Sequence, residues 1–282
     1  MSSASEPQSV IRRSNVVLFG EMGAGKSSIV NLIFGLDHDV ARTSSGASSC
    51  TLDARPYDVT IQRRDFRIFD TVGLNEPQSP RDPDCLISAI NKAYRLVRYL
   101  LHNGGINLLI FCTRRGRITA NMQQNYLLFY DFLCHKKVPV ALVITHLEHE
   151  ENMEDWWLYN HLHFEECGID LVGHACITAR REFHNRYRAS RQVLHDLLIA
   201  HGCGVGFTDE KASWAAGKSR RRSVQKLREY GLREDEIAVL LKIQAVDEDL
   251  ALIRPSRGLR DALEWAWARI RTPTVCDIYH AI

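Results

Sequence analysis

The stretch GEMGAGKS, from Gly20 to Ser27, decides the fold of this chain. It matches G-x-x-x-x-G-K-[ST], the pattern of a loop that cradles phosphate groups. Residues 15–19 before it form an apolar run typical of a buried strand, and residues 26–34 after it are typical of a helix. A strand, a tight loop and a helix in this order are the context that a phosphate-binding loop needs.

The residue types in this loop suit a nucleotide. Glycine lets the main chain bend and leaves no Cβ in the way of a phosphate. Successive amides and the start of the following helix then offer positive potential to an anion. Lys26 is predicted to reach the β- and γ-phosphates, and the Ser27 hydroxyl is predicted to bind Mg²⁺. The phosphate-binding residues predicted here are Gly20, Gly23, Ala24, Gly25, Lys26, Ser27 and Ser28.

Composition narrows the class of protein. The chain has 282 residues, of which 45% are hydrophobic and 25% charged, so it can build a sizeable core. Its net charge of +2 does not favour general attraction to nucleic acid, and we predict no specific nucleic-acid partner. The sequence has no transmembrane segment, and its eight cysteines lack a C-x-x-C pair, which favours reduced thiols and a cytoplasmic location. A basic stretch at 218–222 leaves contact with a membrane surface open.

The order of apolar patterns predicts the fold class. Runs of strand length alternate with helical patterns from residue 15 to about residue 202, which predicts an α/β fold with a doubly wound, mostly parallel sheet. We expect a disordered lead-in at 1–13, a nucleotide-binding domain at 14–202 and a small helical extension at 203–282. The expected strands are 15–19, 59–62, 66–69, 106–112, 138–145 and 174–178, and the expected helices are 26–34, 86–102, 119–134, 153–167 and 189–200.

A second nucleotide signal follows the hairpin predicted at 59–69. The segment FRIFDTVG ends a strand in D-x-x-G, with Asp70 and Gly73 at the two fixed positions. An Asp at a strand tip beside the phosphate loop can hold Mg²⁺, and a Gly after it can donate its N–H to the γ-phosphate. A threonine between the two motifs is expected to reach the metal and the γ-phosphate. Thr51 is our candidate, with Thr43, Ser48 and Ser49 as alternatives.

These motifs in this order resemble the translation-factor-class GTPases, in the branch that holds septins, immunity-associated GTPases and chloroplast import receptors. The chain is similar to fungal "G domain-containing" proteins, over about residues 14–202. The resemblance implies a GTPase G domain with GTP or GDP and Mg²⁺ as ligands. It implies catalytic roles for Lys26, Thr51 and Gly73, and metal binding by Ser27, Thr51 and Asp70.

The resemblance also implies where the base would bind, with a departure from the usual pattern. Guanine is usually read by [NT]-K-x-D after a late strand, and this chain has Thr145, His146 and Glu148 there. Glu148 can make the contacts of the Asp with one more methylene, and His146 can cover the purine. Ala179, at the end of the next strand, is small enough for its N–H to meet the guanine O6. Recognition of no particular base stays an alternative.

A further departure concerns hydrolysis. Leu74 follows D-x-x-G, where many GTPases have a glutamine that orients water, so we expect slow turnover. A homodimer through the nucleotide face, or another partner, could supply a catalytic group. Three arginines, Arg114, Arg115 and Arg117, could act in this way, although a solvated basic loop is the interpretation we favour.

The functional hypothesis is therefore a guanine-nucleotide switch with slow, Mg²⁺-dependent GTP hydrolysis. The first alternative is a scaffold that holds nucleotide without useful turnover and assembles through its nucleotide face. The second alternative is an ATP-using enzyme with the same phosphate loop.

Overall fold

The structure is a computed structural model, and it describes residues 13–35, 40–41, 55–71 and 83–208. It also describes seven separate positions, 224, 225, 228, 234, 237, 238 and 241, and gives only the backbone of residues 55 and 83–91. The chain divides into two compact units, Met1–Lys211 and Ala212–Ile282. The boundaries predicted from the sequence, 14–202 and 203–282, stay a prediction.

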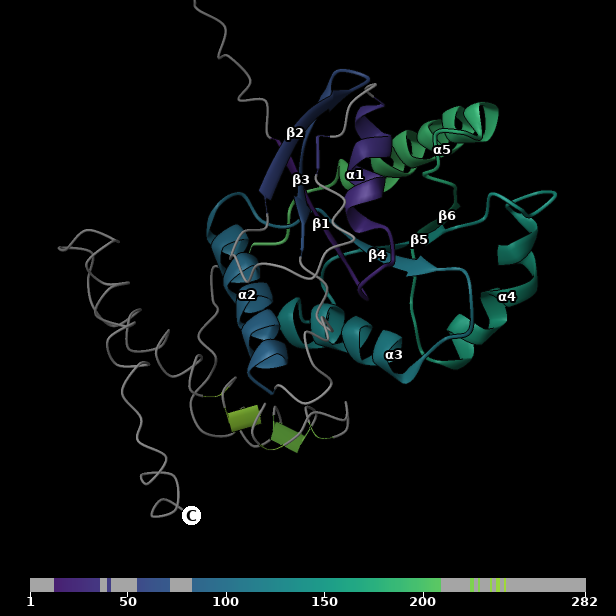
Figure 1. Cartoon of the computed structure of the whole chain (residues 1–282). Helices are drawn as coiled ribbons and strands as arrows, with labels where there is room; N and C mark the ends of the chain where they lie inside the picture. Colours follow the sequence, from purple (N-terminus) through teal and green to yellow (C-terminus); the bar gives the residue numbers. More distant parts are fainter. Residues whose placement is uncertain are drawn as a thin grey trace, which may run out of the picture. The chain divides into compact units, whose positions relative to one another are not determined.

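The first unit contains a six-stranded sheet in the order β2-β3-β1-β4-β5-β6 (Figure 1). Every neighbouring pair is parallel except β2 and β3, which form an antiparallel hairpin. This mostly parallel sheet confirms the predicted α/β class. The strands are β1 (Ser14–Gly20), β2 (Arg55–Ile61), β3 (Arg64–Asp70), β4 (Leu108–Arg114), β5 (Val140–Thr145) and β6 (Gly173–Cys176).

Register brings the ends of distant strands to one edge of this sheet. Leu18 pairs with Asp70 at the end of β3, and Gly20 pairs with Cys112 on β4. Thr145, the last residue of β5, pairs with Arg114, the last residue of β4. Ligands of open α/β sheets bind at the carboxyl ends of the strands, and all of these residues lie there.

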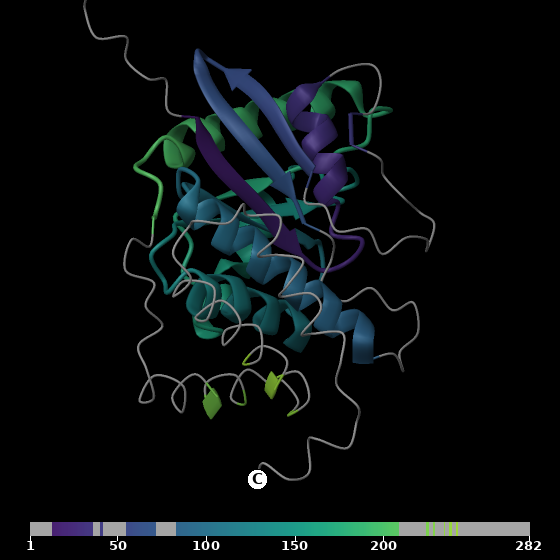
Figure 2. The ribbon, with the colours of Figure 1, turned by 90° about the vertical axis from the view of Figure 1, so that its left-hand side faces the viewer.

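Helices cover both faces of the sheet. In Figures 1 and 2, α1 (Lys26–Phe34) and α5 (His184–Gly202) lie on one face, and α2 (Pro83–His102) and α3 (Ala120–Tyr126) lie on the other. The remaining helix, α4 (Asp155–Glu166), contacts β6 through Trp157, whose ring stacks on His174 with centroids 4.3 Å apart. The fold thus has three layers, as the alternation of strands and helices predicts.

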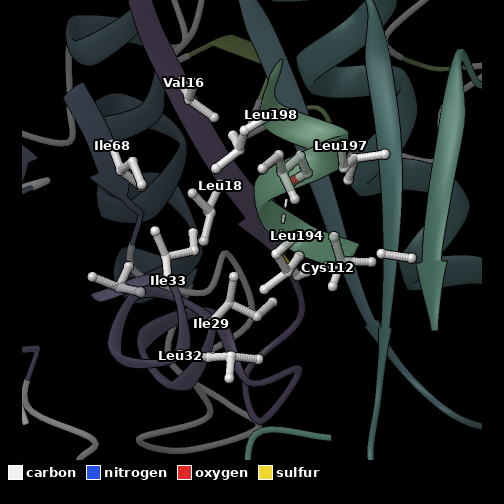
Figure 3. Packing of buried hydrophobic residues seen from close by; sticks show 14 of the residues in the cluster. Val16, Leu18, Ile29, Leu32, Ile33, Ile68, Cys112, Leu194, Leu197 and Leu198 are labelled. Atoms are coloured by element: carbon white, nitrogen blue, oxygen red, sulfur yellow. Dashed lines mark hydrogen bonds between the residues drawn. The ribbon is translucent and has the colours of Figure 1, made fainter. Parts of the chain in front are cut away.

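Alternating residues of the central strand fill two cores. Val16 and Leu18 face α1 and α5 and pack with Ile29, Leu194 and Leu198, all fully buried (Figure 3). Burying side chains of this size stabilises a fold by about 1.5–3 kcal/mol each.

The second core lies on the opposite face of the same strand. Phe19 stacks between Phe111 and Phe129, with ring centroids 4.9 and 4.5 Å away. Successive side chains of a strand point to opposite faces, so β1 contributes to both cores.

The helix expected at 119–134 differs from the prediction. Only Ala120–Tyr126 is α-helical, and Leu127–Leu133 forms a π-helix, η1. The phenol of Tyr126 donates to the carbonyl of Asp170 across 3.1 Å and accepts from its N–H across 2.8 Å. A contact with a residue 44 positions away fixes this side chain, and no periodicity in the local sequence indicates such a contact. The other expected elements are present, although β2 begins at Arg55, four residues earlier than expected, and α5 begins at His184, five residues earlier.

Several sequence predictions lie outside the described residues. These are Thr51 with its alternatives Thr43, Ser48 and Ser49, the residues Gly73 and Leu74, the basic stretch 218–222, and the lead-in 1–12. Among the residues that the structure describes, none of the helices combines the length and apolarity required to cross a membrane.

Candidate nucleotide-binding site

The loop between β1 and α1 has the backbone shape that its glycines predict. Gly20, Gly23 and Gly25 have φ angles of 144°, 76° and 85°, in the region that favours glycine. A Cβ on Gly20 would lie 2.1 Å from the carbonyl oxygen of Cys112, and a Cβ on Gly25 would lie 3.2 Å from Thr145 Cγ2. The loop therefore fits closely over the ends of β4 and β5, and it leads into the nine-residue helix α1.

Lys26 lies at the start of α1 and points back across the loop. Its ammonium donates to the carbonyl oxygens of Gly20, at 3.0 Å, and Glu21, at 2.9 Å. The side chain is buried, so its charge acts in surroundings of low dielectric. A cation held at this point of a helix N-terminus is well placed to attract phosphate oxygens.

Ser27 and Asp70 meet next to this lysine. The Ser27 hydroxyl donates to Asp70 Oδ2 across 2.6 Å, although the two residues are 43 positions apart. Burial raises the pKa of Asp70, while the Ser27 hydrogen bond and the Lys26 charge oppose that rise. A carboxylate that burial penalises gains most from a cation, and oxygen donors are the ligands that Mg²⁺ prefers. These two residues fit an Mg²⁺ ion.

Thr145 joins the phosphate side of the site to the base side. Its hydroxyl lies 3.1 Å from the carbonyl oxygen of Ala24, 3.2 Å from that of Thr113 and 2.8 Å from His146 Nδ1. A hydroxyl has one proton and donates to one group at a time, and the roles of the hydroxyl and of His146 Nδ1 in their contact depend on the tautomer of the ring. This arrangement fixes the end of β5 beneath the phosphate loop.

His146 lies in the position where the usual motif has a lysine. Its φ of 64° is uncommon for a residue with a side chain, and it turns the chain sharply after β5. Burial lowers the pKa of His146, and the charge of Arg114 lowers it further, so the ring is neutral near pH 7. A neutral ring can cover a purine as the sequence predicts, but it brings no positive charge to the base.

Glu148 is buried, and two residues that follow β6 contact its carboxylate. Its Oε2 accepts from the Thr178 hydroxyl across 3.1 Å, and its Oε1 lies 3.7 Å from a guanidinium nitrogen of Arg180. Thr178 is itself fully buried, and its N–H donates to the Ser190 hydroxyl across 3.0 Å. Glu148 thus has a fixed carboxylate at the edge of the sheet where the base is expected.

The sequence prediction did not include Thr178 or Arg180, which flank the predicted Ala179. The half-buried Ala179 lies beyond the end of β6. The N–H of Leu147 donates to the carbonyl of Ile177 across 3.3 Å, which ties the segment after β5 to the segment after β6. The run C-I-T-A-R contains a polar residue at a strand end, and that is the only local signal for the role of Thr178.

Three arginines lie at the end of β4 and just after it. One of them, Arg115, binds two residues of its own chain. The N–H of Arg115 donates to the Thr145 carbonyl across 3.0 Å, and its guanidinium lies 2.7 Å from Glu150 Oε1. Arg114 and Arg117 are exposed. The described structure therefore shows Arg115 bracing the segment after β5 within its own chain.

The N-terminal half of the chain resembles a known protein family. Residues 15–146 match the family described as 50S ribosome-binding GTPase. Together with the sheet order and the phosphate-loop geometry, this match supports a P-loop GTPase domain in this part of the chain. The matched region ends before Glu148 and Ala179, so the base side of the site is supported by geometry alone.

The individual proteins that the chain resembles have low sequence identity to it or match it over a short stretch. GTP-binding protein A from Dictyostelium discoideum is 34% identical over 86 residues, which are 30% of this chain and 17% of that protein. A GTP-binding protein from Sulfolobus solfataricus in complex with GDP is 14% identical with a TM-score of 0.44, over 67% of this chain and 52% of that one. Toc33 from Arabidopsis thaliana in complex with GDP and Mg²⁺ is 17% identical with a TM-score of 0.45, over 70% of this chain and 88% of that one. With TM-scores below 0.5, these two structures support no functional conclusion.

Proposed function

We propose that this protein is a guanine-nucleotide switch that binds GTP and GDP and hydrolyses GTP slowly with Mg²⁺. The observation that supports this most strongly is the convergence of two polar pairs at one edge of the sheet. Ser27 and Asp70 form the pair on the phosphate side, and Glu148 and Thr178 form the pair on the base side. Thr145 connects the two sides through its hydrogen bond to Ala24.

The phosphate side would bind the triphosphate by charge and by main-chain amides. Lys26 neutralises the β- and γ-phosphates, and the amides of the loop from Gly23 to Ser28 donate to phosphate oxygens. Ser27, Asp70 and Thr51 would hold Mg²⁺, and the ion would supply charge stabilisation for the transferring phosphoryl group. Asp70 gives up any bound proton when the cation binds, because both need the same carboxylate.

The base side would select guanine by hydrogen-bond complementarity. Guanine presents two donors on one edge, its N1–H and its 2-amino group, and a carboxylate such as that of Glu148 has only acceptors. The Ala179 N–H donates to the guanine O6. Adenine presents an N1 acceptor to the same carboxylate, so it loses these bonds and places two acceptors opposite each other.

Hydrolysis would depend on positioning. Water attacks the γ-phosphorus in line, the bond from γ-phosphorus to the bridging oxygen breaks, and GDP carries away the electron pair. Gly73 and Thr51 would orient the γ-phosphate, and Leu74 offers no group that orients water, so we expect a slow rate. A second copy of the chain, meeting the first at the nucleotide face, would supply the missing group.

We also propose a cytoplasmic location, since the described cysteines Cys112, Cys134, Cys167, Cys176 and Cys203 are free thiols.

Calorimetric titration with GTP, GDP and ATP, each with and without Mg²⁺, tests the binding proposal. Lys26→Ala should lower the affinity for GDP by about 100-fold or more. Lys136→Ala, at the opposite edge of the sheet, removes an equal charge and should leave the affinity unchanged. Equal affinities of the parent for GDP and ADP would contradict the guanine assignment and favour the ATP alternative.

Turnover measured against protein concentration tests the enzymatic proposal. A rate per molecule that rises with concentration supports activation by a second copy. Tight binding of GTP with no turnover at any concentration would contradict the enzyme and favour the scaffold alternative.

A further inference from the structure

The guanidinium of Arg186 holds the main chain beside Glu148. Arg186 lies in the first turn of α5, and its Nη1 donates to the carbonyl of Glu148 across 3.1 Å and to the carbonyl of Glu150. Its Nη2 donates to the carbonyl of Glu151 across 3.1 Å. One half-buried side chain therefore binds three carbonyls of the irregular segment that follows β5.

The chemistry of this contact suits a brace. A guanidinium is planar and carries five donors in a fixed fork, so it can fix several acceptors at once with little further loss of freedom. Other contacts also hold this segment: Arg115 forms an ion pair with Glu150, in which the arginine side chain is 46% exposed, and the N–H of Leu147 donates to the carbonyl of Ile177. Exposed ion pairs contribute little, whereas the half-buried Arg186 binds three main-chain carbonyls of the segment with one side chain.

The same face of α5 also supports the other residue that fixes Glu148. Ser190 lies four positions after Arg186, on the same side of the helix, and accepts from the N–H of Thr178. Thr178 in turn donates to the Glu148 carboxylate. Through these two residues α5 fixes both the main chain of Glu148 and the hydroxyl that orients its side chain.

We propose that Arg186 is a positioning residue for base selection: it holds the main chain of Glu148 so that the carboxylate meets the base. This inference rests on the proposed recognition of guanine by Glu148. Without the brace the segment keeps its sequence and charge, but the main chain that carries the Glu148 carboxylate is no longer held by Arg186. Arg186 therefore acts on the guanine contacts and leaves the phosphate contacts of Lys26 and Ser27 intact.

A matched control lies on the same helix. Arg191 makes the same kind of contact elsewhere, donating to the carbonyls of Ile33 at 3.2 Å and Phe34 at 3.0 Å, at the end of α1. Replacing either arginine with alanine removes one charge and a set of carbonyl contacts from α5. Of these two arginines, only Arg186 contacts the segment that carries Glu148. Comparing the two alanine variants therefore separates an effect on base selection from an effect on the stability of the fold.

The test is the affinity for GDP and for ADP in Arg186→Ala, Arg186→Lys and Arg191→Ala, with thermal unfolding as a check of the fold. Arg186→Ala should weaken GDP about tenfold and leave ADP within about twofold of the parent. Arg186→Lys, which keeps a donor, should recover part of the loss and serves if the alanine variant does not fold. Arg191→Ala should leave the ratio of the two affinities unchanged, whatever its effect on stability.

Two results would overturn the inference while the proposed function stands. One is an equal loss of GDP and ADP affinity in Arg186→Ala. The other is a full additional loss when Arg186→Ala is combined with Glu148→Ala, because the brace should have no effect on selection once the carboxylate is gone. A parent protein that binds GDP and ADP equally would instead overturn the guanine assignment itself, and the inference with it.

Discussion

The Ser27 hydroxyl donates to Asp70 Oδ2 across 2.6 Å, joining the first turn of α1 to the last residue of β3. Both oxygens come from motifs that the sequence identifies separately, and the parallel pairing of β1 with β3 brings them together. The pair lies beside Lys26, whose charge opposes the rise that burial causes in the pKa of Asp70.

We expect Ser27→Ala to abolish most of the gain in GDP affinity that Mg²⁺ provides, a loss of roughly 10- to 100-fold. Titrations with and without Mg²⁺ measure this gain. Asp65→Asn, near the amino end of the same strand as Asp70, serves as the control and should retain the full effect. A Ser27→Ala protein with an unchanged Mg²⁺ effect would contradict the metal assignment.

Asp70→Asn should lose the same Mg²⁺ effect without losing stability in metal-free buffer. The folded-state pKa of Asp70 is raised above its usual value of 3.8, so the charged form is penalised in the folded protein. The contribution of this group to stability therefore falls as the pH rises from 3.8 through the folded-state pKa, and removing the charge relieves that penalty at neutral pH. Urea unfolding at neutral pH measures it, and a large loss of stability would assign Asp70 a structural role.

Glu148→Gln should change the preferred base. The glutamine amide presents one donor and one acceptor, which match the N1–H and O2 of xanthine and oppose the two donors of guanine. We expect GDP affinity to fall by about 10- to 100-fold and xanthosine diphosphate to bind more tightly than to the parent. The control is Glu166→Gln, which neutralises an exposed carboxylate at the end of α4, outside the base site. An unchanged ratio of the two affinities would show that Glu148 does not contact the base.

The glycines of the phosphate loop should differ in their tolerance of alanine. A Cβ on Gly20 would meet the Cys112 carbonyl oxygen at 2.1 Å, and backbone cannot move aside as a side chain can. Gly20→Ala should therefore cost about 3 kcal/mol or more of unfolding free energy. Gly23 also has a positive φ, but a Cβ added there would have nothing within 4 Å, so Gly23→Ala should cost only about 1–2 kcal/mol. Equal losses in urea unfolding would contradict the close approach of β1 to β4.

His146 should make the nucleotide-free protein less stable at acidic pH. Its folded-state pKa lies below the usual 6.5 because of burial and the Arg114 charge, so the unfolded chain takes up a proton first. The stability that the neutral ring provides is present above 6.5 and is lost as the pH falls toward the folded-state pKa. His146→Gln should reduce the difference in unfolding free energy between about pH 7.5 and about pH 5. His184→Gln, at the exposed start of α5, controls for the loss of a histidine, and an equal reduction there would contradict the prediction.

The sequence predicts the fold and the phosphate side of the site because their signals are local. Glycine spacing, the apolar run of β1 and the D-x-x-G strand end each lie within a few residues, and the sheet topology confirms the class that they predict. The π-helix η1 was not predicted, because Tyr126 is fixed by Asp170 from a distant part of the chain.

The base side could be predicted only in part. Thr145, His146, Glu148 and Ala179 follow a recognisable order, and their roles stay predictions. Thr178 and Arg186 contact Glu148 only after β5, β6 and α5 have come together. A polar residue at a strand end is the one local signal for Thr178, and the sequence around Arg186 gives none. Such partners are found from three-dimensional contacts and not from spacing.

The position of α5 in the chain has a consequence for biosynthesis. This helix supplies Arg186 and Ser190 to the base side, and Arg191 to the end of α1, yet it is the last element of the sheet domain to leave the ribosome. A nascent chain that ends before residue 184 already carries the phosphate loop and every strand of the sheet. It lacks the contacts of Arg186 and Ser190, so the proposed base side would be completed only at the end of domain synthesis.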